Sequence, residues 1–279
     1  MRKVLSGIVA VLLTGTSGYA ADLYEPQVIE APAQEVAVVE TGGWYLRGDT
    51  GWSFNKMRGA HYFPNGTNVS SDFASARLKS GFVVGGGVGY QITDHFRADA
   101  TLDYMFKSNF RGSTIGSCGA APNCTSRDIA SLTALSLLAN AYVDFGTYGS
   151  ITPYVGAGIG GTYVRWGDLK NTSCETTDPT NCDPTITHRG KKSWRFTYAL
   201  MAGASVDVTC NLKADIGYRF RHVTKGDMFG FVGGAGGPGY DKGFYSHEAR
   251  AGLRYSFNGC ETATYIPPAD IPIEQPVYK

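Results

Sequence analysis

Eight stretches of the chain alternate apolar and polar residues with a period of two. The stretch at 245–257 shows this most clearly, with Tyr245, Leu253 and Phe257 at apolar positions and Glu248 and Arg250 at polar ones. Alternation over 13 residues predicts a strand with one apolar and one polar face. Soluble sandwich strands are rarely so long or so charged on one side, so the pattern favours a strand between lipid and a polar interior.

The other predicted strands are separated by connections of two kinds. These strands are expected at 44–55, 81–92, 96–106, 135–145, 152–164, 194–208 and 212–222. Short connections alternate with long ones: the short ones are 93–95, 146–151 and 209–211, and the long ones are 56–80, 107–134, 165–193 and 223–244. Outer-membrane barrels combine short periplasmic turns with long extracellular loops. The sequence therefore predicts an all-β fold, an eight-stranded antiparallel up-and-down transmembrane β-barrel, with both of its ends on the periplasmic side.

Composition narrows the class of protein further. The 279 residues carry a formal net charge of +1, which gives no electrostatic reason to expect nucleic acid as a partner. No apolar stretch after the N-terminus reaches the roughly 18 residues that a membrane-spanning helix needs. Only helices and closed barrels satisfy the backbone inside lipid, so a membrane protein of this composition has to be a barrel.

The first residues, 1–20, are interpreted as an export signal. Arg2 and Lys3 supply a positive start, 4–13 supply a short apolar core, and 18–20 supply small residues at the cleavage positions. The mature chain is then expected to begin near Ala21.

Two further segments flank the predicted barrel at 43–257. The segment 21–42 contains Pro26 and Pro32 and forms no clear apolar face, which predicts a flexible periplasmic linker. The segment 258–279 contains four prolines and is expected to be a Pro-rich periplasmic tail.

The six cysteines of an exported chain are expected to form disulfides. The strand map places two pairs within long connections and one pair at the short-turn end: Cys118–Cys124, Cys174–Cys182 and Cys210–Cys260. Their spacings are not those of a zinc site, so neither a metal nor a cofactor is expected.

Charged residues occupy the polar faces of the predicted strands. The inward charges are Arg47, Asp49, Arg97, Asp99, Asp103, Lys107, Asp144, Arg195, Asp207, Lys213, Asp215, Arg219, Arg221, Glu248, Arg250 and Arg254. They could line a pore, or they could pair with one another and fill the interior. Eight strands leave a lumen just wide enough for side chains, and buried charges need partners, which favours the filled interior. A narrow conducting pathway remains the alternative.

Two short motifs resemble a catalytic site and a nucleotide-binding site. Ser246, His247 and Glu248 are consecutive, but alternation places His247 outside and its neighbours inside, so they cannot form a hydrogen-bonded relay. The glycine-rich run 156–161 matches a dinucleotide pattern, yet no helix follows it. Glycines that permit barrel curvature explain this run better. No catalytic residue is therefore expected.

Three segments resemble a known family. The residues 138–146, 152–158 and 216–220 look like the small outer-membrane β-barrel surface antigens of alphaproteobacteria, in the wider opacity-protein and porin-like group. The likeness covers 43–257, and the start at 21–23 is also similar. It implies an eight-stranded barrel with abundant surface exposure and no catalytic residues.

In that family the barrel-assembly machinery reads a final strand that ends in an aromatic residue. The resemblance implies that Leu253, Tyr255 and Phe257 act as this assembly signal, although 22 residues follow Phe257 here. The expected partners are outer-membrane lipid and lipopolysaccharide, the assembly machinery, and a host or cell-envelope ligand at the loops. The predicted function is a structural and surface-interaction role through four long extracellular loops. A low-conductance porin-like channel is the alternative, and a lipid-modifying enzyme comes third.

Overall fold

The computed structural model describes residues 42–257, 259 and 260, so the predicted signal peptide and almost all of the two flanking segments lie outside the described residues. The described chain is built on eight long strands: β1 (Gly43–Met57), β5 (Gly81–Gln91), β6 (Phe96–Ser113), β8 (Cys124–Asp144), β9 (Ile151–Trp166), β12 (Lys192–Asp207), β13 (Leu212–Val223) and β16 (Phe244–Ser256). Among the described residues, no helix is long and apolar enough to cross a membrane.

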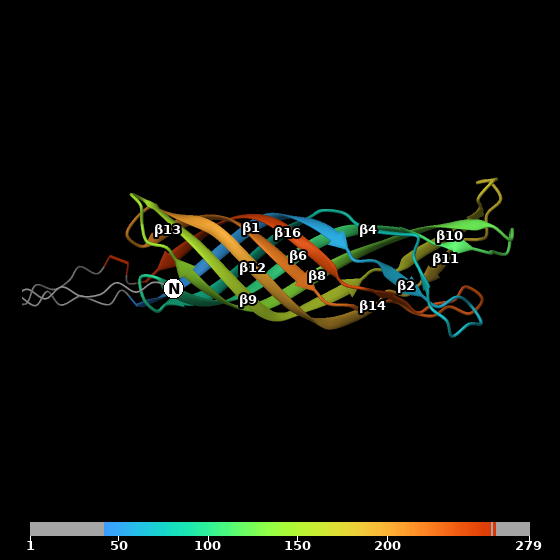
Figure 1. Cartoon of the computed structure of the whole chain (residues 1–279), viewed down its shortest axis with the longest axis horizontal. Helices are drawn as coiled ribbons and strands as arrows, with labels where there is room; N and C mark the ends of the chain where they lie inside the picture. The colour runs from blue at the N-terminus through green and yellow to red at the C-terminus, as the bar shows by residue number, and fades with distance from the viewer. Residues whose placement is uncertain (1–41, 258, 261–279) are drawn as a thin grey trace, which may run out of the picture. The chain divides into compact units, whose positions relative to one another are not determined.

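The eight long strands form an antiparallel ring (Figure 1). Each pairs with its neighbour along the chain, and β16 pairs with β1, where Thr50 lies opposite Ala251. On the other side of the ring β6 pairs with β8, where Asp103 lies opposite Ser136. Every long strand thus has two partners and leaves no unpaired edge within the ring.

The two faces of the ring differ as the period of two predicts. Apolar side chains such as Leu102, Leu200 and Ile216 point outward and are exposed by half or more. Polar side chains such as Asp103 and Glu248 point inward and are fully buried. The ring is therefore apolar outside and polar inside, the reverse of a soluble domain.

Two strands run well beyond their predicted ends. The sequence predicted strands at 96–106 and 135–145, whereas β6 continues to Ser113 and β8 begins at Cys124. A register shift between Met105 and Ser108 marks a β-bulge in β6. Past the bulge the alternation changes phase, so Lys107 is exposed on the outer surface. The prediction that Lys107 faces inward was wrong for this reason.

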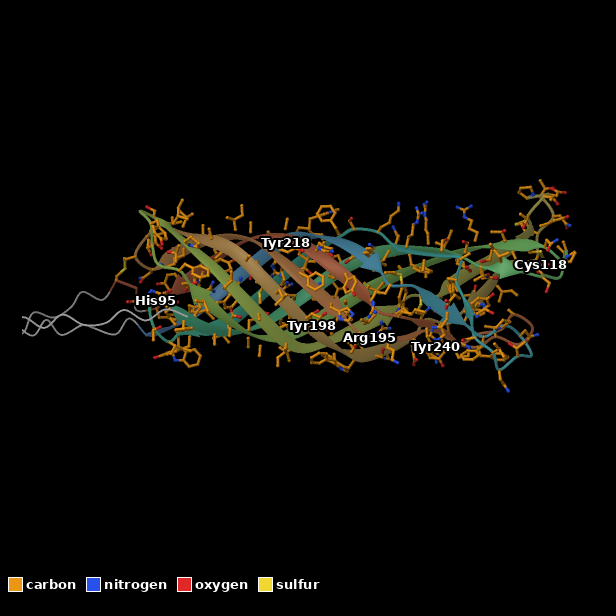
Figure 2. The ribbon with its side chains drawn as sticks, in the orientation of Figure 1. His95, Cys118, Arg195, Tyr198, Tyr218 and Tyr240 are labelled. Atoms are coloured by element: carbon orange, nitrogen blue, oxygen red, sulfur yellow. A yellow bond between two sulfur atoms is a disulfide. The ribbon has the colours of Figure 1, made fainter. Side chains whose placement is uncertain are left out.

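The remaining strands occupy the long connections, all at one end of the ring (Figure 1). They are β2 (Ala60–Tyr62), β3 (Ser71–Asp72), β4 (Ser75–Leu78), β7 (Ile115–Gly116), β10 (Leu169–Glu175), β11 (Ile186–His188), β14 (Gly226–Phe229) and β15 (Gly239–Asp241). Strands β14, β15, β2 and β3 form a separate sheet, while β10 and β11 continue from the extended part of β8. Figure 2 shows His95, in a short turn, and Cys118, in a long connection, at opposite ends.

A buried apolar cluster lies at the end of the ring that carries the long connections. Phe110 on β6, Trp166 on β9 and Phe229 on β14 form its centre, with ring centroids 5.4–6.2 Å apart. Further apolar residues from the ring and the connections surround them: Ala60, Leu78, Val83, Met105, Ala130, Leu132, Ala134, Val164, Leu169, Val223, Met228 and Phe244. The sequence did not predict this core, which holds the long connections onto the ring.

Candidate functional site

The centre of the ring interior is an ion network around Glu248 on β16. Its carboxylate pairs with Arg219 on β13 at 2.7 Å, with Arg221 at 2.5 Å and with Arg250 at 3.2 Å. Asp103 on β6 pairs with Arg219 and Arg250, each at 2.7 Å. Two carboxylates are thus shared by three guanidinium groups, and Coulomb attraction in a site shielded from water holds the strands in register.

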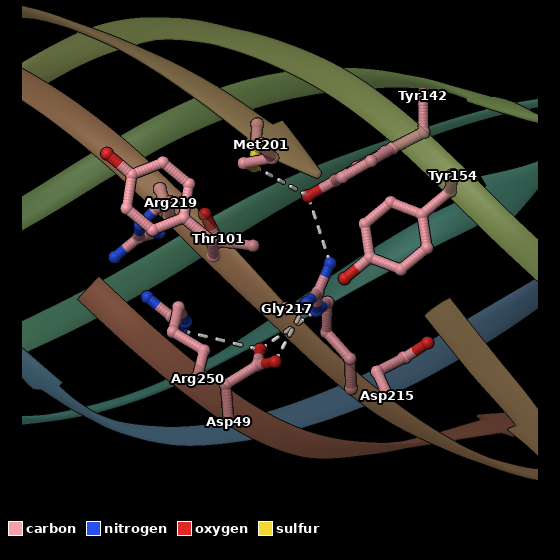
Figure 3. Close-up of a pocket in the computed structure, with 11 residues that line it drawn as sticks. Asp49, Thr101, Tyr142, Tyr154, Met201, Asp215, Gly217, Arg219 and Arg250 are labelled. Carbon is pink, nitrogen blue, oxygen red and sulfur yellow. Dashed lines mark hydrogen bonds and ion pairs between the residues drawn. The ribbon is translucent and has the colours of Figure 1, made fainter. Parts of the chain in front are cut away.

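A second part of the network lies nearer the short turns. Arg47 bridges Asp49 at 2.7 Å and Asp99 at 2.9 Å, and it donates a hydrogen bond to the Tyr142 hydroxyl at 3.0 Å. Arg97 pairs with Asp144 at 3.1 Å, and its guanidinium lies 4.0 Å from the centre of the Tyr142 ring. Figure 3 shows Asp49, Tyr142 and Arg250 pointing into the same space.

Not every predicted inward charge joins this network. Arg254 pairs loosely with Asp215 at 3.5 Å. Asp207 and Lys213 pair at 2.7 Å, but both remain about one-third exposed at the short-turn end. Arg195 pairs at 2.7 Å with Asp241, a residue of β15 that the sequence analysis did not single out, because a loop strand gives no sign of which ring strand it will meet.

Glycines on the inner face make room for the larger side chains of neighbouring strands. A Cβ atom on Gly158 would collide with the side chain of Asn140, and one on Gly89 would collide with the ring of Tyr45. These glycines therefore allow close packing of the interior, in addition to the curvature that the sequence analysis assigned to the glycine-rich run.

The space left inside the network is small. A cavity of about 20 Å³ lies between Arg47, Asp49, Tyr142 and Arg250 (Figure 3). This is room for about one water molecule. The described interior thus contains paired charges at the middle of the ring and towards the short turns, and the apolar cluster at the end that carries the long connections.

A polar cavity among the long connections measures about 500 Å³ and is called the loop cavity here. Residues of β7, β8, β10 and β11 line it, among them Gly116, Asp128, Asn171 and His188. Asp128 accepts hydrogen bonds of 2.6 Å from the Ser126 hydroxyl and from the Asn171 amide. Rigid walls around a concave polar site are suited to ligand binding.

Disulfides fasten the chain at both ends of the ring. Cys118–Cys124 and Cys174–Cys182 lie in the long connections, and Cys210–Cys260 joins the last short turn to the residues after β16. Among the described residues no cysteine is left unpaired.

Burial of the Asp128 carboxyl group in the wall of the loop cavity is expected to make the stability of the fold depend on pH. Asp128 lies on the extended part of β8, beyond the predicted membrane span, and its burial raises the pKa of the carboxyl group above its ordinary value. A raised pKa in the folded state means that protonation stabilises the fold. This contribution is complete below the unfolded pKa of about 3.9 and is lost as the pH rises through the raised value.

We expect Asp128→Asn to gain stability relative to the natural chain as the pH rises from 4 to 7. Asparagine imitates the protonated carboxyl and cannot ionise, so only the natural chain is destabilised by ionisation. Thermal unfolding of both proteins in the same detergent, measured across that range, checks the sign. A difference in melting temperature that does not change with pH would contradict the assignment.

His247 is held apart from the two residues beside it. Ser246 and Glu248 face the interior, where the Ser246 hydroxyl donates a hydrogen bond of 3.1 Å to the Glu248 carboxylate. His247 lies on the outer face, where its Nδ1 is 2.6 Å from the Tyr218 hydroxyl. The three consecutive residues therefore do not form a hydrogen-bonded relay.

The last strand closes the ring through its pairing with β1. Leu253, Tyr255 and Phe257 all lie on the outer face, about half exposed. The Phe257 amide donates a hydrogen bond of 3.1 Å to the Trp44 carbonyl, so the ladder continues past the end of β16.

Comparisons with known proteins agree with this architecture. The family model described as outer membrane protein beta-barrel domain matches residues 28–257. An uncharacterized protein of Brucella abortus is 36% identical over 285 residues, covering 89% of this chain and 98% of the relative. A putative adhesin of Rickettsia conorii is 29% identical over 274 residues, covering 91% and 99%.

Two solved structures that are similar to the chain share little sequence with it. Neisserial surface protein A is 18% identical, covers 78% of this chain and all of its own, and has a TM-score of 0.41. The outer membrane protein OprG of Pseudomonas aeruginosa is 13% identical, covers 77% and 97%, and has a TM-score of 0.47. From the family match and the Brucella relative, the chain belongs to the outer membrane protein beta-barrel domain family and is an outer-membrane β-barrel protein.

Proposed function

We propose that the eight strands form a closed transmembrane barrel that presents the long connections outside the cell, where they bind a surface ligand, and that the interior does not conduct ions. One observation carries the proposal: the long connections fold onto the end of the ring around a shared apolar core, and they contain two disulfides and a cavity of about 500 Å³. Within the described part of the chain, the connections at the opposite end are all short turns. A purely structural barrel has no need of such an arrangement at one end.

The apolar outer face supports placement in lipid, which a pair of substitutions on β6 can test. Leu102→Arg is expected to cost about 2–4 kcal/mol, because it puts a charge at the middle of the membrane span. Asn109→Arg, exposed on the same strand beyond the bulge, is expected to cost about 0–1 kcal/mol. Equilibrium unfolding in lipid vesicles measures both costs. Equal costs at the two positions would contradict the membrane placement.

The filled interior supports a barrel that does not conduct. The cavity described among the paired charges has room for about one water, and the apolar cluster lies between these charges and the loop end. We expect no stable current steps from the purified protein in a planar lipid bilayer. Stable steps of large conductance would instead favour the porin-like alternative.

The surface-interaction role is supported by relatives in Rickettsia that are named putative adhesins. We propose that the loop cavity takes part in binding a host or cell-envelope ligand. Display of the chain on a non-adherent laboratory bacterium, with counts of attachment to cultured mammalian cells, tests this. Attachment no better than that of the host strain alone would overturn the adhesion proposal.

Two glycines allow a matched test of the cavity itself. A side chain at Gly116 or at Gly233 meets no atom within 4 Å of its Cβ, and neither glycine has a positive φ. Gly116 lines the loop cavity, whereas Gly233 does not. We expect Gly116→Trp to fill the cavity and abolish attachment, and Gly233→Trp to leave it unchanged. Equal attachment by both variants would place the binding site elsewhere on the loops.

Leu253, Tyr255 and Phe257 are proposed to be the signal that the barrel-assembly machinery reads. Their exposure on the outer face of the closing strand supports this role, because the strand must be available before it pairs with β1.

A further inference from the structure

Two cations lie directly opposite each other on the outer face of the ring. Arg165 on β9 and Lys192 on β12 are register partners, and both are exposed. Neither makes an ion pair or a side-chain hydrogen bond with any of the described residues. Like charges at directly opposed positions of an antiparallel pair destabilise the sheet. An anion between them would turn this repulsion into two attractions.

The pair has a defined height relative to the apolar belt. The next outward register pair towards the short turns is Tyr163 and Trp194, whose ring centroids are 5.4 Å apart. Exposed aromatic residues at the edge of an apolar belt mark the boundary between hydrocarbon and headgroups. Arg165 and Lys192 each lie two residues from this aromatic pair on the side of the long connections, about 6–7 Å farther along the strands, which is the depth of the lipid headgroups.

A cleft of about 740 Å³ adjoins the pair and adds two more cations, Arg189 and Lys191. One acidic residue, Asp168, lines the cleft and accepts a hydrogen bond from the Gly190 amide at 2.9 Å. Lys191 lies 3.7 Å from Asp227, a residue outside the lining. Arg165, Arg189 and Lys192 outnumber Asp168, so the cleft has an excess of positive charge.

A second pair of opposed cations lies farther from the aromatic boundary. Arg77 on β4 and Arg111 on β6 are also exposed register partners. Arg111 lies five residues beyond Phe106, whose ring centroid is 5.7 Å from that of Phe82. At the short-turn end the partly exposed Lys213 is paired instead with Asp207. Opposed cations that have no ion-pair partner among the described residues thus lie towards the end of the ring that carries the long connections.

We propose that the cleft around Arg165 and Lys192 binds the phosphate group of a phosphorylated glycolipid in the outer leaflet of the membrane. The inference rests on the proposed function, which places the long connections outside the cell. A phosphate group offers several acceptor oxygens and more than one negative charge, so it can engage an arginine and a lysine together. The aromatic pair below would contact the acyl chains of the same lipid.

Binding of lipid A to the folded chain in detergent tests the proposal. Three probes are compared: diphosphorylated lipid A, dephosphorylated lipid A, and inorganic pyrophosphate. The variant is Arg165→Gln/Lys192→Gln. The control, Arg127→Gln/Lys170→Gln, removes the same charge from exposed positions on β8 and β10 that lie farther from the aromatic boundary. Heat-modifiable gel mobility establishes that each variant is folded.

We expect diphosphorylated lipid A to bind the natural chain at least tenfold more tightly than the dephosphorylated form. The Arg165→Gln/Lys192→Gln variant should lose affinity about 10–30-fold, since each cation at a membrane surface contributes on the order of a kilocalorie per mole. The control should stay within twofold. Unchanged binding by the variant would overturn the proposal, and so would pyrophosphate binding as tightly as lipid A, which indicates a site for any free anion. Bilayer and attachment measurements on the same preparations report separately on the proposed function.

Discussion

Replacing Glu248 with alanine is expected to destabilise the folded protein by about 3–5 kcal/mol, the cost of breaking a buried ion pair from one side. Glu248 is fully buried, and its carboxylate is shared by Arg219, Arg221 and Arg250. Arg219 and Arg250 retain Asp103, but among the described residues Arg221 keeps only the hydroxyl of Ser136 as a partner. A buried guanidinium without a counter-charge is the main source of the loss.

Equilibrium unfolding by denaturant in lipid vesicles measures this loss, with Asp207→Asn as the control. Asp207 also belongs to an ion pair, but its pair with Lys213 is partly exposed to water and should contribute about 0–1 kcal/mol. Losses of similar size for Glu248→Ala and Asp207→Asn would mean that the interior network is hydrated like a surface, and would favour the porin-like alternative.

The sequence could predict which side chains face lipid and which face the interior, because successive side chains of a strand point to opposite faces. Once Leu253 and Tyr255 are assigned to lipid, Glu248, Arg250 and Arg254 must face the interior. The same alternation predicted that Lys107 faces the interior, and this prediction was wrong. A bulge adds one residue to a strand without any change in composition, so nothing in the sequence of β6 indicates where the phase reverses.

The sequence could not predict which charged residues of the ion network pair with one another. Asp103 and Glu248 converge on Arg219 from strands that are not neighbours in the ring, and their meeting depends on the tilt and stagger of the strands. Arg195 meets Asp241 only because β15 folds back over the ring. An alternating pattern states which face a residue occupies but not its height along the barrel.

The packing of the long connections around a shared apolar core is the largest feature that sequence analysis missed. Phe110 and Phe229 lie in segments that read as polar connections, because their apolar residues are few and widely separated. They form a core only when β6, β9 and β14 bring them together with Trp166. Long-range convergence of single apolar residues has no periodic signal. The cavity beside this core, with Asp128 and His188 in its wall, was hidden for the same reason.

Replacing Phe110 with alanine is expected to cost about 3–5 kcal/mol, because the ring is fully buried between Trp166 and Phe229 and its removal leaves a cavity. Phe106→Ala on the same strand is the matched control. Its ring faces outward, so acyl chains can fill the space that it leaves and the expected loss is only about 1–2 kcal/mol.

Equilibrium unfolding in lipid vesicles compares the losses of stability caused by Phe110→Ala and Phe106→Ala. Amide hydrogen exchange shows which strands are affected. Phe110→Ala should raise exchange in β10 and β14, which rest on the apolar cluster, while the amides at the middle of the ring stay protected. Phe106→Ala should leave the exchange of both loop strands unchanged. If the two variants lost the same stability and exchanged alike, the apolar core would not support the long connections. The loop cavity would then lack the rigid support that a binding surface on this barrel requires.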